Sequence, residues 1–332
     1  MAILRKINSR AKTDSNTGFG INSSDYGGRF LNKDGQPNLE KRGISLLERI
    51  SWFHTMLSVP TWQFFTLIFL FFILVNFIFA CIYFFIGVDH LSGMNAVTEV
   101  EKFGEAFFFS SQTFTTVGYG RVSPAGFTTS AVSSLEALIG LLSFALVTGL
   151  LYGRFSKPIA YLKFSQNALI SPFKDGLALM LRITPFKNTT LTEAETKLTL
   201  AMSIEENGKI SNKFFPLELE YEKVNSLTLS WTIVHPITES SPLYNFTKED
   251  FGNINGEIIV YIKAFDDMFS NTVVARSSYT FGEIIYGAKF LPMYDRSSNS
   301  KTTVLHLDKL NSYKEVDISS LVTSSTEKVI NS

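Results

Sequence analysis

"TFTTVGYGRVSP", residues Thr113–Pro124, lies between two long apolar segments of the chain. Within it, Gly118 and Gly120 flank a tyrosine and follow a threonine–valine pair. Glycine is a local cost that is justified where the backbone needs unusual dihedral angles, or where another group must approach the main chain closely. The motif therefore indicates that this backbone segment has a function. The flanking sequence is needed to identify the group that approaches the main chain here.

The two flanking segments are long enough to cross a membrane. Phe64–Val88 contains 25 residues without a charge, and Thr129–Gly153 is equally long with one charge, Glu136. A helix of that length rises ~37 Å, enough to cross ~30 Å of hydrocarbon. The first segment begins too far along the chain to be a cleaved signal peptide. We expect two spanning helices; the alternative is a pair of buried helices in a soluble core.

The charge distribution predicts an orientation. Residues 1–63 carry nine Lys and Arg, residues 89–128 carry two, and Arg154 and Lys157 directly follow the second segment. The positive-inside rule predicts that both termini lie in the cytoplasm and that the loop between the spans lies outside. The membrane is expected to be the cell membrane (inner or plasma). Because 30 Lys and Arg balance 30 Asp and Glu, no nucleic-acid partner is indicated. The single cysteine excludes an intrachain disulfide framework.

An amphipathic pattern precedes the first span. Ser45–Ser58 has apolar residues at helical spacing, Pro60 ends it, and Trp62 suits an interfacial anchor. This segment is either a helix in the membrane interface or an ordinary amphipathic helix packed on protein. Residues 1–40 are polar and are expected to be a flexible cytoplasmic segment.

After Pro158 the pattern changes to short β-branched or alternating runs. They are separated by turn-forming sequences such as "ENGK" and "GNING" and comprise Leu177–Ile183, Thr196–Ile204, Ser226–Val234 and Glu257–Phe265. Such spacing predicts an antiparallel β-sandwich of immunoglobulin type in the cytoplasm. We assign residues 41–158 to the membrane domain, 159–320 to the sandwich and 321–332 to a polar tail.

The loop between the spans predicts an ion path. Phe103–Phe114 is a short apolar half-helix whose C-terminal end favours a cation. Non-helical backbone at membrane depth is tolerated only where protein buries it or where it lines a path. The carbonyls of Thr116, Val117, Gly118, Tyr119 and Gly120 can replace the hydration shell of K⁺. A nucleotide-binding loop is excluded because no strand precedes the motif and G-x-G-x-x-G is not completed.

One such strand cannot enclose a path. Closure by cyclic symmetry is the natural solution, and carbonyl rings of the known kind need four copies. We therefore expect a homotetramer.

Several segments carry a family resemblance. They are "EAFFFSSQTFTTVGYG", "SSLEALIGLLSFALVTGLLYGRFSKP", "LKFSQNALISPF", "SWTIVHPITESSPLYNFTKED" and "VVARSSYTFGEIIYGAKF". Together they resemble inward-rectifier potassium channels, especially the prokaryotic branch. The resemblance implies two transmembrane helices with a re-entrant pore helix and filter, an interfacial slide helix and a tetrameric β-sandwich vestibule. It also implies passive conduction, gated at the inner helices and at a cytoplasmic loop.

The resemblance also implies roles for residues beyond the filter. Phe144, Thr148 and Tyr152 recur every four residues and would line the cavity, with Tyr152 at the gate; the alternative is packing against a neighbouring helix. The cytoplasmic gate loop would be Phe269, Ser270, Asn271 and Thr272. Gly140 and Gly149 are either hinges or packing contacts.

Phe144 departs from strongly rectifying members, which carry an acidic or polar residue there to hold polyamines or Mg²⁺. These cytosolic cations are expected to be weak blockers here. Asp266 and Asp267 match the region of acidic vestibule residues, although a solvated charge pair is the simpler interpretation.

Basic residues at the cytoplasmic face form a collar that attracts anionic lipids. We expect Arg49, Arg154 and Lys157 to contact such lipids, with phosphoinositide as a candidate; the alternative is that these charges only set the topology. Glu136 is expected to brace the filter from behind, near Gln112 or Thr115. Four scattered histidines predict no protein metal site, and no cofactor is expected besides the permeant K⁺.

Three functions compete at this level. The main hypothesis is a potassium-selective pore, and a second is a non-conducting membrane sensor whose sandwich binds a ligand. A two-helix channel gated by a nucleotide-binding domain would need βαβ units after Gly153, which the strand-rich pattern contradicts. No nucleophile elbow, metal cluster or phosphate loop supports an enzyme.

Overall fold

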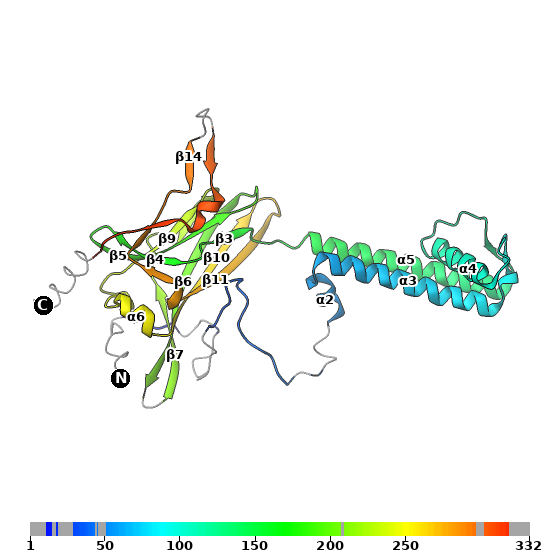
Figure 1. Ribbon diagram of the computed structural model, residues 1–332, viewed down its shortest axis with the longest axis horizontal. Coiled ribbons are helices and arrows are strands. Elements are labelled where there is room, and N and C mark those ends of the chain that lie inside the picture. Colours follow the sequence, from blue (N-terminus) through cyan, green and yellow to red (C-terminus); the bar gives the residue numbers. More distant parts are fainter. Residues whose placement is uncertain are drawn as a thin grey trace, which may run out of the picture. The chain divides into compact units, whose positions relative to one another are not determined.

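The structure is a computed structural model that describes residues 11–14, 18, 29–43, 45, 51–206, 209–296 and 302–318. The expected polar tail, 321–332, lies outside this range. The chain divides into two compact units, one of residues 42–157 and one formed by the chain before and after it. The first is helical and the second is built from β-strands (Figure 1).

The helical unit contains two long helices and two shorter ones within its described residues. They are α2 (Trp52–Ser58), α3 (Thr61–Ile86), α4 (Glu99–Phe114) and α5 (Phe127–Phe155). The loops add a 3-10 turn, η1 (Val88–His90), and the paired short strands β1 (Leu91–Ser92) and β2 (Ser123–Pro124). At 26 and 29 residues, α3 and α5 are long and apolar enough to cross a membrane.

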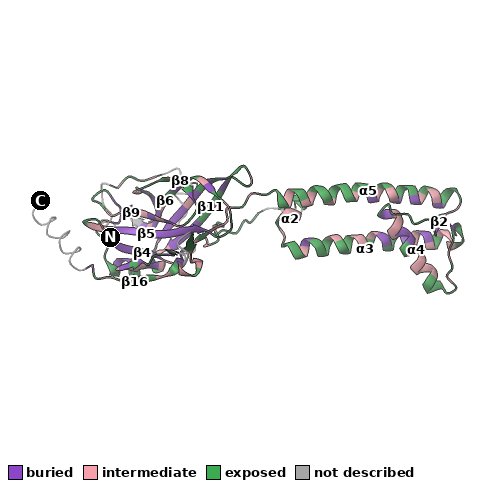
Figure 2. Ribbon diagram, turned by 90° about the horizontal axis from the view of Figure 1, so that it is seen from above, coloured by how far each residue is buried: buried purple, intermediate pink, exposed green. Residues whose placement is uncertain are grey.

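The surfaces of α3 and α5 exclude a soluble core. Only 17% and 11% of their most apolar stretches are buried, and Figure 2 shows exposed residues along both helices. A helix that is apolar all round must be covered by protein or by lipid. The alternative of two buried helices in a soluble core is therefore wrong.

The helix α4 begins earlier than the sequence indicated. Thr98 and Glu101 form a reciprocal capping box, so the helix starts at Glu99 rather than Phe103. The helix packs on α3 through aromatic pairs, with ring centroids 5.1 Å apart for Tyr83–Phe109 and 6.0 Å apart for Phe72–Phe114. This packing sets the position of the chain that leaves its C-terminus.

The helix α2 covers the end of the predicted segment Ser45–Ser58. Ser51 caps it by accepting a hydrogen bond from the backbone N–H of His54. Trp52 and Phe53 are 75% and 63% exposed, as suits a helix in the membrane interface. Residues 46–50, including Arg49, lie outside the described residues.

Two five-stranded sheets form the β unit. One has the order β11-β10-β6-β7, with β8 also paired to β6, and the other has the order β12-β4-β5-β3, with β9 also paired to β5. Buried residues of both sheets form one core, which confirms the predicted sandwich. The strands are β3 (Leu162–Phe164), β4 (Ala168–Phe173), β5 (Gly176–Pro185), β6 (Leu191–Glu206), β7 (Lys209–Leu217), β8 (Lys223–Leu227), β9 (Trp231–Pro236), β10 (Gly256–Asp266), β11 (Asn271–Thr280) and β12 (Ile284–Tyr286).

The β unit also contains smaller elements. They are the helix α6 (Lys248–Asn253), the 3-10 turns η2 (Phe281–Glu283) and η3 (Leu307–Asn311), and two short two-stranded sheets. One sheet pairs β13 (Ala288–Phe290) with β16 (Tyr313–Glu315), and the other pairs β14 (Tyr294–Arg296) with β15 (Thr303–Leu305).

Two sequence expectations about the strands are wrong. Ser226–Val234 is not one strand, because its first part belongs to β8 and pairs with β6, whereas its second part belongs to β9 and pairs with β5. The chain therefore passes from one sheet to the other at residues 228–230. The sandwich is also not purely antiparallel, since β12 runs parallel to β4.

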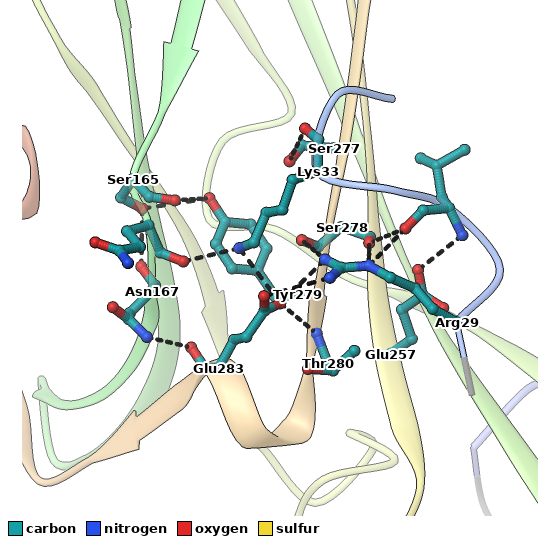
Figure 3. A network of polar contacts seen from close by, with 12 residues as sticks. Arg29, Lys33, Ser165, Asn167, Glu257, Ser277, Ser278, Tyr279, Thr280 and Glu283 are labelled. Atoms are coloured by element: carbon teal, nitrogen blue, oxygen red, sulfur yellow. Dashed lines mark hydrogen bonds and ion pairs between the residues drawn. The ribbon is translucent and has the colours of Figure 1, made fainter. Parts of the chain in front are cut away.

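Residues 29–38, expected to be flexible, are docked on the outer face of β10 and β11. The buried Glu257 carboxylate accepts the backbone N–H groups of Phe30 (2.5 Å) and Leu31 (3.0 Å). Figure 3 shows Arg29 and Lys33 converging on Glu283, at 3.0 and 3.3 Å. Burial alone would raise the pKa of Glu283, but a hydrogen bond from the Thr280 backbone and the two nearby cations together lower it. Polar contacts therefore hold this segment.

Candidate functional site

The segment after α4 has an unusual backbone. Thr116, Gly118 and Gly120 have φ angles of 58°, 50° and 81°, and they alternate with residues of negative φ. In an ordinary extended strand successive carbonyls face opposite sides. Inverting φ at every second residue cancels that alternation, so successive carbonyls can face one side. The glycines adopt this conformation at little cost, whereas Thr116 is strained.

The start of this segment is anchored to the end of α4. The backbone N–H groups of Val117 and Gly118 donate to the Gln112 carbonyl, at 2.9 and 3.3 Å. Gln112, expected to support a filter, thus contacts this segment through its main chain. The side chains of Val117 and Tyr119 are 53% and 80% exposed in the single chain. They leave apolar and aromatic surface for further protein to cover.

The end of the segment is also pinned. The Arg121 guanidinium lies 3.2 Å from the Glu105 carboxylate of α4 and 3.3 Å from the carbonyl oxygen of Gly93. A Cβ on Gly93 would lie 1.8 Å from the Arg121 carbonyl oxygen, so only glycine allows this approach. This contact between Glu105 and Arg121 was not predicted from the sequence.

Glu136 of α5 is fully buried behind α4. One carboxylate oxygen, Oε2, accepts a hydrogen bond from the Tyr83 hydroxyl of α3 at 2.6 Å, and Oε1 contacts the Ser110 hydroxyl of α4. The contact was expected near Gln112 or Thr115 at the end of α4, and the structure places it at Ser110, two residues before Gln112. Ser110 is the residue of α4 that faces α5 at this depth.

Asn76 extends this cluster, which the sequence analysis missed. Its Oδ1 lies 3.0 Å from the Ser110 hydroxyl, and its amide donates to the Phe72 carbonyl at 2.7 Å. A sequence signal existed, because Asn76 and Tyr83 are seven residues apart in an apolar span and so share one helix face. Polar residues in a span usually meet other polar groups.

Comparison with known protein families agrees with this geometry. Residues 68–157 match the family model described as "Ion channel", and residues 162–330 match "Inward rectifier potassium channel C-terminal domain". The chain belongs to the inward rectifier potassium channel family. This is a family of membrane ion channels, not of enzymes, and the resemblance drawn from the sequence is confirmed.

Individual relatives cover most of this inward rectifier. It is 34% identical over 271 residues to inward rectifier potassium channel Kirbac3.1 from Paramagnetospirillum magnetotacticum, covering 80% of this chain and 89% of the relative. It is 28% identical over 305 residues to ATP-sensitive inward rectifier potassium channel 12 from Bos taurus, covering 85% and 71%. Among solved structures, the sporulation control protein Spo0M from Bacillus subtilis has a TM-score of 0.22 at 10% identity, covering 38% and 50%, too little to inform function.

In this inward rectifier, the Arg154 side chain contacts other residues of the same chain. Its guanidinium donates to the carbonyls of Met56 (2.6 Å) and Val59 (2.8 Å) at the end of α2, and lies 4.6 Å from the ring centroid of Phe64. It therefore satisfies carbonyls that the helix terminus leaves unpaired. Lys157, the other described residue expected to contact lipid, is exposed.

The side chains expected at the pore and gates lie on two separate elements. Phe144, Thr148 and Tyr152 are exposed on α5, with Phe144 and Tyr152 at 71% and 75%. Phe269 and Ser270 lie in the turn between β10 and β11, and Asn271 and Thr272 begin β11. Ser270 has a φ of 46°, which marks a tight turn.

Asp266 is not half of a solvated charge pair. It is fully buried, and its Oδ1 accepts the backbone N–H groups of Met268 (2.9 Å) and Phe269 (3.4 Å). The side chain instead caps the turn that contains Phe269 and Ser270, because the exposed turn backbone needs an acceptor. Of the two aspartates, only Asp267 is exposed.

Proposed function

We propose that this chain forms a potassium-selective, passively conducting pore through Thr116–Gly120. The observation that carries the proposal is the alternating sign of φ along the TVGYG segment. The segment is anchored to α4 by hydrogen bonds, and its exposed side chains are those that a neighbouring copy would cover. Aligned carbonyl oxygens replace the hydration shell of K⁺. No cofactor is required, and K⁺ is the permeant ion.

The pore is a homotetramer. Each chain contributes one filter strand, and exposed aromatic residues such as Tyr119 and Phe127 (80% and 91% exposed) are covered by adjacent copies or lipid. Fourfold cyclic symmetry closes the ring of carbonyls. Both termini lie in the cytoplasm, since the basic residues are concentrated on that side of the spans.

Two constrictions gate conduction. Phe144, Thr148 and Tyr152 line the inner cavity, and the Tyr152 side chains narrow the pore and stop ions by dewetting. The turn Phe269–Thr272 forms the cytoplasmic constriction, with Asp266 holding its backbone. Block by Mg²⁺ or polyamines is weak, because Phe144 offers no charge and Asp266 is buried.

Anionic lipids, including phosphoinositides, modulate the channel at its cytoplasmic face. Lys157 is the exposed contact, and Arg49 belongs to the same proposed collar. Arg154 contributes its positive charge there, while two of its donors remain on the α2 carbonyls. Each basic residue near an anionic surface contributes about 1 kcal/mol of attraction.

Potassium flux into liposomes tests the function. The reconstituted protein is expected to pass K⁺, to exclude Na⁺ and to be blocked by Ba²⁺, which matches K⁺ in size and carries twice its charge. Vesicles prepared without the protein serve as the leak control. Equal fluxes of K⁺ and Na⁺, or none above this control in any lipid mixture, would favour the non-conducting sensor instead.

Arg154→Gln is expected to alter gating without removing lipid sensitivity. The substitution breaks the contacts with Met56 and Val59, so α5 is no longer tied to α2, and open probability changes several-fold even in neutral lipids. Lys157→Gln is the matched control, which should change only the response to added anionic lipid. Single-channel recording with and without phosphoinositide separates the two, and identical behaviour of both variants would contradict the assignment.

A further inference from the structure

The contacts around Glu136 can be tested by counting protons. Ser110 has a single hydroxyl proton, yet its Oγ lies within hydrogen-bonding distance of two oxygens, Oε1 of Glu136 and Oδ1 of Asn76. The Asn76 amide nitrogen donates to Phe72, which leaves Oδ1 as an acceptor. If Glu136 were ionised, one of the two Ser110 contacts would place acceptor against acceptor.

We propose that Glu136 is a neutral carboxylic acid whose Oε1 proton is donated to Ser110. Each hydroxyl and carboxyl proton then has one acceptor, in a single direction: Tyr83 donates to Oε2 of Glu136, Glu136 to Ser110, and Ser110 to Asn76. The chain ends where Asn76 donates to the Phe72 carbonyl. No member is left unpaired and the network carries no net charge.

The surroundings favour the neutral form. Glu136, Tyr83, Ser110 and Asn76 are all fully buried, and the side chains that contact the carboxyl group are uncharged. An ionised carboxylate inside a membrane is costly unless a cation or several donors compensate it. A carboxylic acid avoids that cost and supplies the donor that the cluster otherwise lacks.

This proton positions the pore helix. Glu136 lies on α5, Tyr83 and Asn76 on α3, and Ser110 on α4, so the network ties three helices together. Ser110 lies two residues before Gln112, whose carbonyl oxygen accepts hydrogen bonds from the filter backbone. This part of the inference rests on the proposed function, and Glu136 is a positioning residue rather than an ion ligand.

Substitution of Glu136 distinguishes the protonation states. In Glu136→Gln the amide N–H donates to Ser110 and the amide oxygen accepts from Tyr83, as the carboxylic acid does. This variant is expected to keep K⁺ selectivity and a thermal midpoint within about 2 °C of the parent. Glu136→Leu leaves the Tyr83 hydroxyl without its acceptor and Ser110 without its donor, and it is expected to lower the midpoint by about 5 °C or more and to reduce selectivity.

Infrared spectroscopy of the full-length protein in lipid at neutral pH detects directly whether the Glu136 carboxyl group is protonated. The parent is expected to show the C=O stretch of a carboxylic acid, and Glu136→Gln should lose it. Glu105→Gln is the matched control, because Glu105 is paired with Arg121 and should contribute no acid band. This readout does not depend on conduction, so failed K⁺ flux would overturn the proposed function and leave the protonation assignment standing.

Two results would overturn the inference. One is a parent spectrum from which Glu136→Gln removes no acid band. The other is a Glu136→Gln protein as destabilised as Glu136→Leu, since an amide that replaces a neutral acid should preserve the network. Should the leucine variant fail to assemble, the spectrum and the glutamine variant still decide the question.

Discussion

Replacing Gly118 with aspartate is expected to abolish potassium selectivity while the protein still assembles. Gly118 has a φ of 50° and its N–H binds the Gln112 carbonyl. A Cβ at this φ strains the backbone, so the carbonyls lose their common direction. The added carboxylate would also offer a strong, unselective cation ligand in place of carbonyl rings. The permeability ratio of K⁺ to Na⁺ should fall to about 1.

The companion substitution Tyr119→Ala tests the same segment by a different route. It removes the exposed ring that adjacent copies are proposed to cover, so the strand loses its support but keeps its glycines. Reversal potentials in mixed K⁺ and Na⁺ solutions measure selectivity, and size-exclusion chromatography in detergent checks assembly. Sodium exclusion that survived both substitutions would contradict the filter assignment.

Gly140→Ala is expected to produce a large loss of stability in the helical unit. A Cβ at Gly140 would lie 2.0 Å from the Phe114 carbonyl oxygen and 2.8 Å from its carbon, at the end of α4. Backbone cannot move aside as a flexible side chain does, so α4 must separate from α5. Overpacking of this kind costs about 3 kcal/mol. The thermal midpoint of the purified protein should fall, and selectivity should fall with it because Phe114 precedes Thr116 by two residues.

Gly149→Ala is the matched control on the same helix. No described residue of the single chain lies within 4 Å of a Cβ at Gly149, and alanine is a better helix former by about 1 kcal/mol. Its thermal midpoint should be unchanged or slightly raised. Equal stability of the two variants would refute the packing role of Gly140 and leave the hinge interpretation open.

These contacts decide between interpretations that the sequence left open. Gly140 packs against the end of α4, which favours the packing contact over the hinge at that position. The exposed faces of α3 and α5 exclude the soluble core. Phe144 and Tyr152 are exposed in the single chain, and we propose that they line the pore.

Features that depend on neighbours in the chain were predictable. Hydrophobic length identifies the spanning helices, alternation identifies strands such as Glu257–Phe265, and the order T-V-G-Y-G after a half-helix marks the segment that we propose as the filter. The same local patterns carry the family resemblance. Boundaries were less predictable, because the start of α4 depends on the Thr98–Glu101 capping box and the break after β8 depends on which sheet each half joins.

Contacts between distant residues were decided by tertiary structure alone. The sequence placed a carboxylate in a span, a basic residue after it and an acidic pair at a hairpin, but each can meet many partners. Glu136 meets Tyr83, 53 positions away, and Arg154 meets Met56, 98 positions away. Residue type and spacing fix which local element forms, because backbone sterics and hydrophobic periodicity act over a few residues. Which polar groups meet depends on how those elements pack, and burial then makes each pairing obligatory.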